Sequence, residues 1–283
     1  MGEDLFRAID AVARDRDEAG TTLRCLDLGA SRQIAREFGV SAREVHVAAL
    51  ERGVVPLRYL KNIGTIGVDG QLKLLGSRVV VVGAGGIGGN AASLLARMGV
   101  GTIVLVDADV FDETNLNRQC FATEEALGAP KVETMLGCLV EINRDVEVVD
   151  CHLEANRDNL PKLVRGADVV IDALDTLSDR LALENVCRSV GVVMVHGAIA
   201  GDCLQVMTVY PGDPGLSSIV PAGGPGKTRG IEVETGNPAT TPALAAAFQV
   251  QEAVKVILGR GETLRGRMLY IDTGDWTIEL IEL

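Results

Sequence analysis

Aromatic residues, histidines and paired cysteines are scarce in this chain of 283 residues. Aromatic residues make up 3% of it, so we expect a core built mainly from Val, Leu, Ile and Ala. The six cysteines are scattered and none belongs to a C-x-x-C pair, which argues against a zinc ribbon or a thioredoxin-like site. We expect most of them to be small buried residues of a reducing compartment.

The chain also lacks a membrane-spanning run, a secretory leader and a surplus of basic residues. The longest apolar stretch, residues 79–106, contains seven glycines and is interrupted by Arg97, so it predicts strand, turn and helix rather than a membrane span. The first 16 residues are mixed and charged, unlike a signal peptide. The formal net charge of −12 argues against broad binding to nucleic acid or anionic membranes. We therefore expect a cytoplasmic protein.

Strand and helix patterns alternate over most of the chain, which is long enough for one large domain and a small accessory region. Apolar strands are predicted at 78–82, 102–106, 146–149, 168–172 and 192–196, with helices between them. This alternation predicts an α/β fold with a Rossmann-like, doubly wound and mostly parallel sheet. Three further strands, predicted at 205–210, 268–272 and 277–281, are expected to add antiparallel edge strands.

Two regions depart from this alternation. Residues 211–242 are rich in Gly, Pro, Ser and Thr, and a connection of that length predicts a functional crossover loop. Residues 1–56 are helical in pattern and are expected to form a separate N-terminal region, with the α/β domain at 57–283.

Within the N-terminal region, Ala35, Gly39 and Val45 have the spacing of a helix-turn-helix. Residues 1–56 contain eight Arg and no Lys against ten acidic residues, a balance that does not favour contact with DNA phosphates. We favour a small packed helical cap, with a DNA-reading region as the alternative.

A glycine-rich turn follows the first strand of the α/β domain. Its pattern, Gly83-x-Gly85-Gly86-x-Gly88, opens a helix, so that backbone N–H groups and the helix dipole can bind a pyrophosphate. Asp107 ends the next strand, where a carboxylate can accept hydrogen bonds from ribose hydroxyls. Taken alone, these residues fit a nicotinamide or flavin enzyme as well as an ATP-using one.

The residues that follow favour a triphosphate over a nicotinamide. Arg118 offers a planar fork of donors for phosphate oxygens, and Lys131 at the start of a later helix adds a second cation. Asn115 and Gln119 can place amides around the same group. Two cations aimed past a pyrophosphate suit nucleotidyl transfer, because charge accumulates on the leaving group.

A triphosphate requires Mg²⁺, for which Asp172 and Asp175 supply carboxylates. Asp172 ends a strand at the expected switch point of the sheet, and Asp175 follows in the loop. We predict that Asp175 is the metal ligand, with Asp172 in a supporting role.

In this order and spacing, the motifs resemble the MoeB/ThiF/HesA group, bacterial relatives of the ubiquitin-activating (E1) enzymes. The resemblance covers about residues 57–283 and is carried by the glycine turn, Asp107-x-Asp109, Asn115-Leu116-Asn117-Arg118-Gln119, Pro130-Lys131 and Asp172-x-x-Asp175. It implies ATP-dependent adenylation of the C-terminal glycine of a small ubiquitin-like sulfur carrier, with release of pyrophosphate, as in molybdopterin or thiamine biosynthesis.

The resemblance also implies roles for individual residues. The expected nucleotide contacts are Gly83, Gly85, Gly86, Gly88, Asp107, Asp109, Thr114, Asn115, Leu116, Asn117, Arg118, Gln119, Lys131, Asp175 and Thr176. Such enzymes are usually homodimers in which an arginine from the partner subunit completes each site. Arg58 and Lys61 are the candidates here, Lys61 standing where the family motif has its second arginine.

The chain departs from the family pattern in two ways. Many relatives bind a structural zinc through two C-x-x-C pairs, whereas residues 214–218 and the C-terminus contain no cysteine, so no zinc is expected. Some relatives form a thioester on a cysteine of the crossover loop. Residues 211–242 contain none, so we expect adenylation without a covalent thioester step.

Three other functions are compatible with parts of the sequence. One is adenylation of another carboxylate, such as that of a tRNA-borne modified nucleoside, as in a dehydratase branch of the superfamily; the negative charge disfavours it. A nicotinamide-dependent oxidoreductase would need a catalytic side chain, and His196, which we expect to pack beside the sheet edge, is the plausible histidine. The third is a regulator that senses nucleotide and binds DNA or a partner through residues 1–56.

Overall fold

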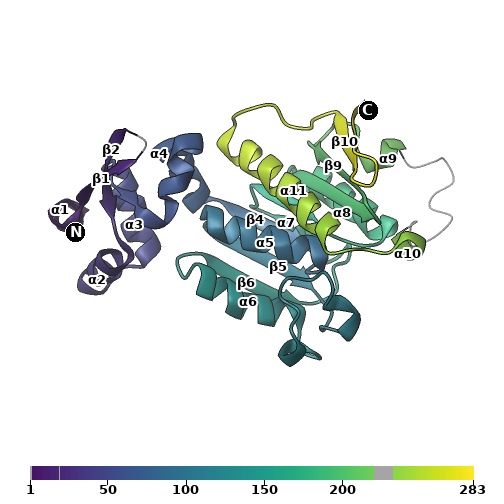
Figure 1. Ribbon diagram of the computed structural model, residues 1–283, viewed down its shortest axis with the longest axis horizontal. Helices are drawn as coiled ribbons and strands as arrows, with labels where there is room; N and C mark the ends of the chain where they lie inside the picture. Colours follow the sequence, from purple (N-terminus) through teal and green to yellow (C-terminus); the bar gives the residue numbers. More distant parts are fainter. Residues whose placement is uncertain (1, 19, 220–231) are drawn as a thin grey trace.

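The computed structural model describes residues 2–18, 20–219 and 232–283, which form a small N-terminal unit and a larger α/β body (Figure 1). The body contains an eight-stranded sheet in the order β11-β10-β9-β8-β7-β4-β5-β6. Its strands are β4 (Arg78–Val82), β5 (Thr102–Asp107), β6 (Glu147–His152), β7 (Val169–Asp172), β8 (Val193–Ala200), β9 (Cys203–Val209), β10 (Arg267–Asp272) and β11 (Thr277–Glu282). Strands β4 to β8 are parallel and the other three antiparallel, which confirms the predicted sheet.

The chain reverses its direction of winding at β4. From this central strand it builds β5 and β6 on one side, then crosses to β7 and β8 on the other. Val82, at the end of β4, is paired with Val106 of β5 and with Asp172 of β7. The carboxyl ends of these strands therefore surround the switch point, where open α/β sheets bind their ligands.

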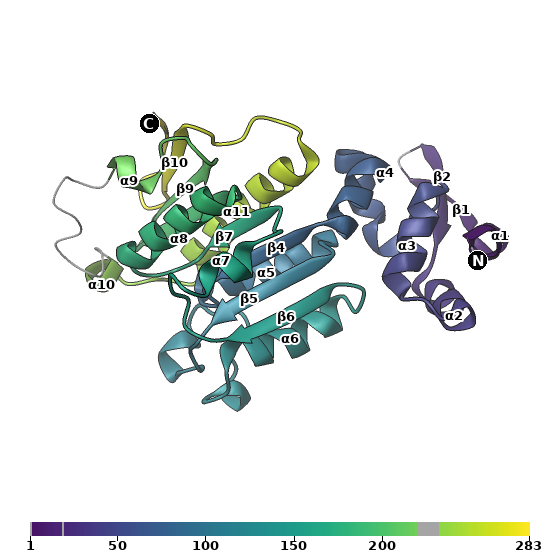
Figure 2. The same ribbon diagram turned by 180° about the vertical axis from the view of Figure 1, so that it is seen from behind.

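Helices cover both faces of the sheet. Figure 1 shows α5 (Gly86–Met98), α6 (Lys131–Ile142) and α11 (Thr240–Leu258) on one face, and Figure 2 shows α7 (Leu160–Val164) and α8 (Leu177–Val190) on the other. Val79 and Val81 pack into the first layer, whereas Val80 and Val82 pack into the second. A strand covered on both faces has a continuous run of apolar residues in its sequence. Burial of each such side chain contributes about 1.5–3 kcal/mol to the stability of the fold.

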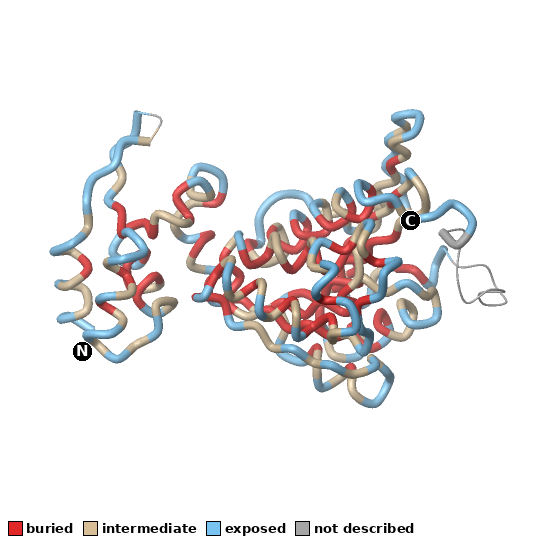
Figure 3. The backbone as a smooth tube through the Cα atoms, turned by 60° about the horizontal axis from the view of Figure 1, so that its bottom comes forward, coloured by how far each residue is buried: buried red, intermediate tan, exposed pale blue. Residues whose placement is uncertain are grey.

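Figure 3 shows buried residues throughout the body and a separate buried group in the N-terminal unit. None of the helices in the described part of the chain combines the length and apolar character needed to cross a membrane.

The glycine turn between β4 and α5 has no room for side chains at two positions. Gly83 has φ +97°, and a Cβ there would lie 2.4 Å from the carbonyl oxygen of Ala173. A Cβ on Gly88 would lie 1.8 Å from the carbonyl oxygen of Gly83. These glycines let α5 start directly against the sheet, so its N-terminus faces the switch point.

The N-terminal unit contains strands as well as the predicted helices. Its elements are α1 (Gly2–Val12), β1 (Arg14–Glu18), β2 (Thr21–Leu26), α2 (Leu28–Phe38), α3 (Ala42–Glu51) and β3 (Val55–Pro56), and the strands form one small sheet. The helical pattern of the sequence is present in α1, α2 and α3, but it did not indicate the three short strands. β1 reads Arg-Asp-Arg-Asp-Glu and is mostly exposed, and β3 has two residues, so neither carries the apolar alternation by which a strand is recognised.

Helices α2 and α3 form the predicted helix-turn-helix, with Gly39 at φ +66° between them and Ser41 capping α3. Half of α3 is nevertheless buried, including Val45 and His46, and it packs on α4 (Leu60–Gly76). The Arg43 guanidinium donates to the carbonyl oxygen of Gly101 in the body at 2.6 Å. The helix that would read DNA therefore faces the body, which favours the interpretation as a packed cap.

A buried polar cluster joins the N-terminal unit to the amino end of the sheet, and we call it the junction: His46, Arg58, Tyr59, Asn143 and Asp145. Arg58 Nη1 donates to Asp145 Oδ2 at 2.6 Å, and Asn143 Nδ2 donates to the Tyr59 hydroxyl at 3.0 Å. His46 Nδ1 lies 3.4 Å from the same Asp145 oxygen. Burial lowers the pKa of His46 to about 4, although the Asp145 carboxylate opposes this shift, so the imidazole is neutral at neutral pH.

Parts of the predicted crossover 211–242 belong to the described residues. They include two short helices, α9 (Leu216–Ile219) and α10 (Glu232–Thr235), and the start of α11. Residues 220–231 lie outside the described residues.

Candidate active site

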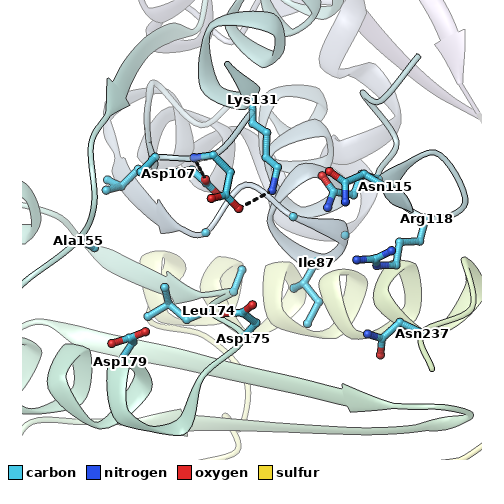
Figure 4. A pocket seen from close by; sticks show the side chains of 18 of the residues that line it. Ile87, Asp107, Asn115, Arg118, Lys131, Ala155, Leu174, Asp175, Asp179 and Asn237 are labelled. Carbon is cyan, nitrogen blue, oxygen red and sulfur yellow. Dashed lines mark hydrogen bonds and ion pairs between the residues drawn. The ribbon is translucent and has the colours of Figure 1, made fainter. Parts of the chain in front are cut away.

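A cavity of about 600 Å³ opens at the carboxyl ends of β4, β5 and β7 (Figure 4). Eleven of the predicted nucleotide contacts line it: Gly83, Gly85, Gly86, Asp107, Asp109, Thr114, Asn115, Arg118, Gln119, Lys131 and Asp175. They come from the glycine turn, the end of β5, the following loop, the start of α6 and the β7–α8 loop. The fold therefore brings motifs that are far apart in the sequence around one space.

Six predicted site residues do not line this cavity. They are Arg58, Lys61, Gly88, Leu116, Asn117 and Thr176. Gly88 packs against the glycine turn, and Thr176 caps α8 by accepting from the N–H of Asp179. Arg58 belongs to the junction, and Lys61 forms an ion pair with Glu18. These last two were predicted to act in the partner's site, so that role stays a proposal.

Lys131 is a buried cation at the edge of the cavity. It is the first residue of α6, and the residue is 5% exposed. Its ammonium group donates to Asp109 Oδ2 at 2.9 Å. An ammonium group has three donors, so the bond to Asp109 fixes Lys131 and leaves donors for a phosphate.

Arg118 follows the short helix η2 (Glu113–Asn115) and is held by its own loop. Its Nη1 donates to the carbonyl oxygen of Thr114 at 2.8 Å and to Asn117 Oδ1 at 2.9 Å. Both of these bonds use Nη1, and the guanidinium lines the cavity. The remaining donors of this planar fork suit a phosphate group.

Asp107 ties the glycine turn to the end of β5. Its Oδ2 accepts from the N–H of Ala84 at 2.6 Å and its Oδ1 from the N–H of Asp109 at 2.7 Å. Each carboxylate oxygen has a second lone pair that can accept from a ribose hydroxyl. Gln119 also lines the cavity, and its Oε1 is buried and accepts no hydrogen bond from the described residues.

Carboxylates from the β7–α8 loop and the start of α8 line the cavity, and a buried aspartate lies beneath the loop. Asp175 is exposed and lines the cavity, and Asp179 does so from the first turn of α8. Asp172 beneath them is buried: its Oδ2 lies 2.7 Å from His196 Nδ1, and its Oδ1 accepts from the N–H of Leu174. Asp172 thus supports the loop rather than facing the cavity.

His196 does not line this cavity, which weakens the oxidoreductase alternative. Its side chain is fully buried on β8, inside the sheet rather than at its edge. Burial lowers its pKa, although the bond to Asp172 opposes the shift.

Sequence reasoning missed several lining residues, among them Glu154, Asp179, Arg180 and Asn237. The guanidinium of Arg180 donates twice to the carbonyl oxygen of Leu174, from Nε at 3.0 Å and from Nη2 at 2.7 Å. Asp179 and Arg180 lie in the first turn of a predicted helix that begins at the switch point. That position could have indicated that they line the cavity. Asn237 had no such signal, because its place depends on how the crossover folds back.

Comparisons of the sequence agree with the motifs. The ThiF family matches residues 59–283. The SAMP-activating enzyme E1 of Haloferax volcanii is 38% identical over 226 residues, which cover 79% of this chain and 84% of that protein. The adenylyltransferase and sulfurtransferase MOCS3 of Aedes aegypti is 35% identical over 233 residues, 80% of this chain and 52% of that protein. The chain thus spans about half the length of that MOCS3 protein.

Solved structures support the same fold. E. coli MccB superposes with a TM-score of 0.69 at 23% identity, and PaaA with a TM-score of 0.68 at 21% identity. Each alignment covers 80% of this chain and 72% of the other. The sequence matches confirm the resemblance that the motifs indicated: the chain belongs to the ThiF family of E1-like adenylyltransferases.

Proposed function

We propose that this protein uses Mg-ATP to adenylate the C-terminal glycine of a small ubiquitin-like sulfur carrier and releases pyrophosphate. The observation that carries the proposal is the meeting of Arg118, Lys131 and Asp175 around one cavity, beside a glycine turn at the switch point. The names of the H. volcanii and A. aegypti relatives describe activation and adenylyl transfer by those proteins, and they support the same activity here.

The chemistry needs positioning and charge neutralisation rather than a general base. A C-terminal carboxylate is already ionised at neutral pH and attacks the α-phosphate, so that the bond to the β-phosphate breaks and pyrophosphate leaves. Arg118 and Lys131 stabilise the charge that accumulates on the leaving group. Asp107 orients the ribose, and the N-terminus of α5 faces the phosphates.

The carboxylates of the β7–α8 loop fit a bound Mg²⁺. Asp175 and Asp179 both line the cavity, and the described residues contain no cluster of three or more His, Cys, Asp or Glu that could hold a metal by themselves. Mg²⁺ commonly takes one or two carboxylates and completes its shell with phosphate oxygens and water. Asp175 would be the ligand in our proposal, and the ion would neutralise triphosphate charge.

We also propose a homodimer in which a cation of one subunit completes the site of the other. Lys61 is the better candidate, because 82% of its side chain is exposed. The side chain of Arg58 is 23% exposed and bound to Asp145. Because residues 211–242 contain no cysteine, we propose adenylation without a thioester step. A reducible conjugate between enzyme and carrier would contradict that part of the proposal.

The test is pyrophosphate release from Mg-ATP with a panel of purified carrier proteins ending in Gly-Gly, followed by mass spectrometry of each carrier. We expect one carrier to stimulate release and to gain the mass of an adenylate. Asp175→Ala serves as the inactive control. ATP binding without release on any carrier would contradict the proposal, and release stimulated by a modified tRNA instead would favour the dehydratase alternative.

A further inference from the structure

The carboxylate of Asp175 lines the cavity without being held by a bond of its own. The residue is exposed, and its side chain makes no hydrogen bond or ion pair with the residues that the structure describes. A group that binds a ligand is most effective when its position is already fixed, because ordering it during binding lowers the affinity. The backbone that carries Asp175 must therefore set its position.

The backbone that leads to Asp175 is hydrogen-bonded at successive groups. The N–H of Ala173 donates to the last carbonyl of β4 at 2.9 Å, and the N–H of Leu174 donates to Asp172 Oδ1 at 3.1 Å. The next group is the carbonyl of Leu174, which belongs to the peptide bond with Asp175. Its oxygen accepts two hydrogen bonds from the side chain of Arg180.

Arg180 holds this carbonyl with two donors of one planar group. Its Nε lies 3.0 Å and its Nη2 2.7 Å from the oxygen. Arg180 belongs to the first turn of α8, and side chains of a helix point back toward its N-terminus, so the guanidinium reaches the preceding loop. A planar fork fixes the orientation of its acceptor as well as the distance to it.

Arg180 is also bonded to the backbone on the other side of Asp175. Its N–H donates to the carbonyl oxygen of Thr176 at 3.1 Å, and the Thr176 hydroxyl caps α8 by accepting from the N–H of Asp179. Asp175 thus lies between two carbonyl groups that both accept from Arg180. The bond to Thr176 comes from the backbone of the helix, whereas the bonds to Leu174 depend on the arginine side chain.

We propose that Arg180 is a positioning residue, which orients the Asp175 carboxylate toward Mg-ATP by clamping the carbonyl of Leu174. This inference rests on the proposed function and adds to it a residue that acts through Asp175. Without the clamp, the peptide bond between Leu174 and Asp175 can rotate, and the carboxylate occupies its binding position for only part of the time. If that fraction falls to about one tenth, Mg-ATP binds about tenfold more weakly.

Arg180 itself lines the cavity, so a direct effect of its charge on the nucleotide is the competing explanation. Arg180→Lys separates the two, because lysine keeps the charge and lacks the planar fork. Calorimetry should show a Kd for Mg-ATP raised about tenfold, and a Kd for ATP without Mg²⁺ changed by less than about twofold. In an Asp175→Ala background, Arg180→Lys should have little further effect on either Kd.

Arg188→Lys is the matched control. Arg188 lies on the same helix, and its Nε and Nη2 also donate to one oxygen, Oε1 of Glu184, at 3.1 and 2.8 Å. Arg188 does not line the cavity, so Arg188→Lys should bind Mg-ATP as the wild type does. Thermal melting checks that each variant is folded.

Three results would overturn this inference alone. They are wild-type affinity of Arg180→Lys for Mg-ATP, an equal loss of affinity with and without Mg²⁺, and an undiminished loss in the Asp175→Ala background. The last two would show that Arg180 acts on the nucleotide directly. If Asp175→Ala bound Mg-ATP as tightly as the wild type, or if the wild type did not bind it, the proposed function would fail first.

Discussion

Polar side chains gather at both ends of the same parallel sheet, but the two groups are bonded differently. At the carboxyl end, Arg118, Lys131 and Asp175 line an open cavity. At the amino end, Arg58 and Asp145 of the junction bond to each other, and the Asp145 side chain is 2% exposed. The difference suggests two roles: Arg118 and Lys131 keep donors free beside a cavity that a ligand can enter, whereas the Arg58–Asp145 pair holds the N-terminal unit in place.

The energetic consequences of mutation should differ in the same way. Removing a cavity residue leaves few broken protein contacts, so it should change activity more than stability. Removing one partner of a mostly buried ion pair leaves a charge that water and protein compensate only in part, so it should change stability more than activity. The predictions below test this contrast from the largest effect to the smallest.

The largest expected effect comes from Asp145→Ala in the junction. It leaves the Arg58 guanidinium without its carboxylate in a mostly buried position, and it should lower the free energy of unfolding by about 3–5 kcal/mol. Urea unfolding measures this. The control Asp10→Ala breaks partly exposed ion pairs to Arg24 and Arg52 and should lower the free energy of unfolding much less. Equal losses of unfolding free energy in the two variants would contradict a special role of the junction in stability.

Asp175→Ala and Arg118→Ala should each reduce adenylation by about two orders of magnitude or more, because each removes charge neutralisation at the triphosphate. Both side chains line the cavity, so the free energy of unfolding should change little. Pyrophosphate release and urea unfolding are measured on the same preparations. Turnover like that of the wild type in either variant would remove that residue from the proposed site.

Gly88→Ala should affect both stability and activity, because a Cβ there would lie 1.8 Å from the carbonyl oxygen of Gly83. Shifting the helix off the turn should cost about 1–3 kcal/mol and weaken binding of Mg-ATP, measured by unfolding and calorimetry. Gly137→Ala in α6 has no atom within 4 Å of the new Cβ, so it should be neutral or stabilising. If Gly88→Ala changed neither the free energy of unfolding nor the binding of Mg-ATP, the tight packing of the turn would be contradicted.

His46 should make stability depend on pH. Its pKa is about 4 in the folded protein, against an ordinary value of 6.5. As the pH falls below 6.5 the unfolded chain takes up a proton that the folded protein does not, so stability falls until the pH nears 4. Between pH 7.5 and 5 the wild type should lose at most about 2 kcal/mol more than His46→Gln. If the unfolding free energies of the wild type and His46→Gln changed equally with pH, His46 would not have a lowered pKa in the folded protein.

The body of the fold could be predicted because its signals are local. Runs such as Val79 to Val82 lie between two helical layers, so every residue is apolar, and the glycine turn follows at once. The strands of the N-terminal unit could not be recognised, since β1 alternates charges instead of apolar residues. Their formation depends on neighbours that the sequence pattern does not reveal.

The site was predictable where a residue follows a strand end at the switch point. Asp107, Arg118, Lys131 and Asp175 all belong to such segments, and all line the cavity. Asn117 shares the loop of Arg118, but its side chain bonds to the crossover instead of lining the cavity. Neither that bridge nor the place of Asn237 follows from spacing along the chain.

The central claim is that the cavity at the carboxyl end performs the chemistry while the junction supplies stability. Its most direct test compares carrier-dependent pyrophosphate release from Mg-ATP by the wild type, Asp175→Ala and Asp145→Ala, each normalised to folded protein. We predict release by the wild type and by folded Asp145→Ala at similar rates, with a loss of about a hundredfold or more in Asp175→Ala. Release by Asp175→Ala at the wild-type rate, or no release by the wild type with any carrier, would contradict the account.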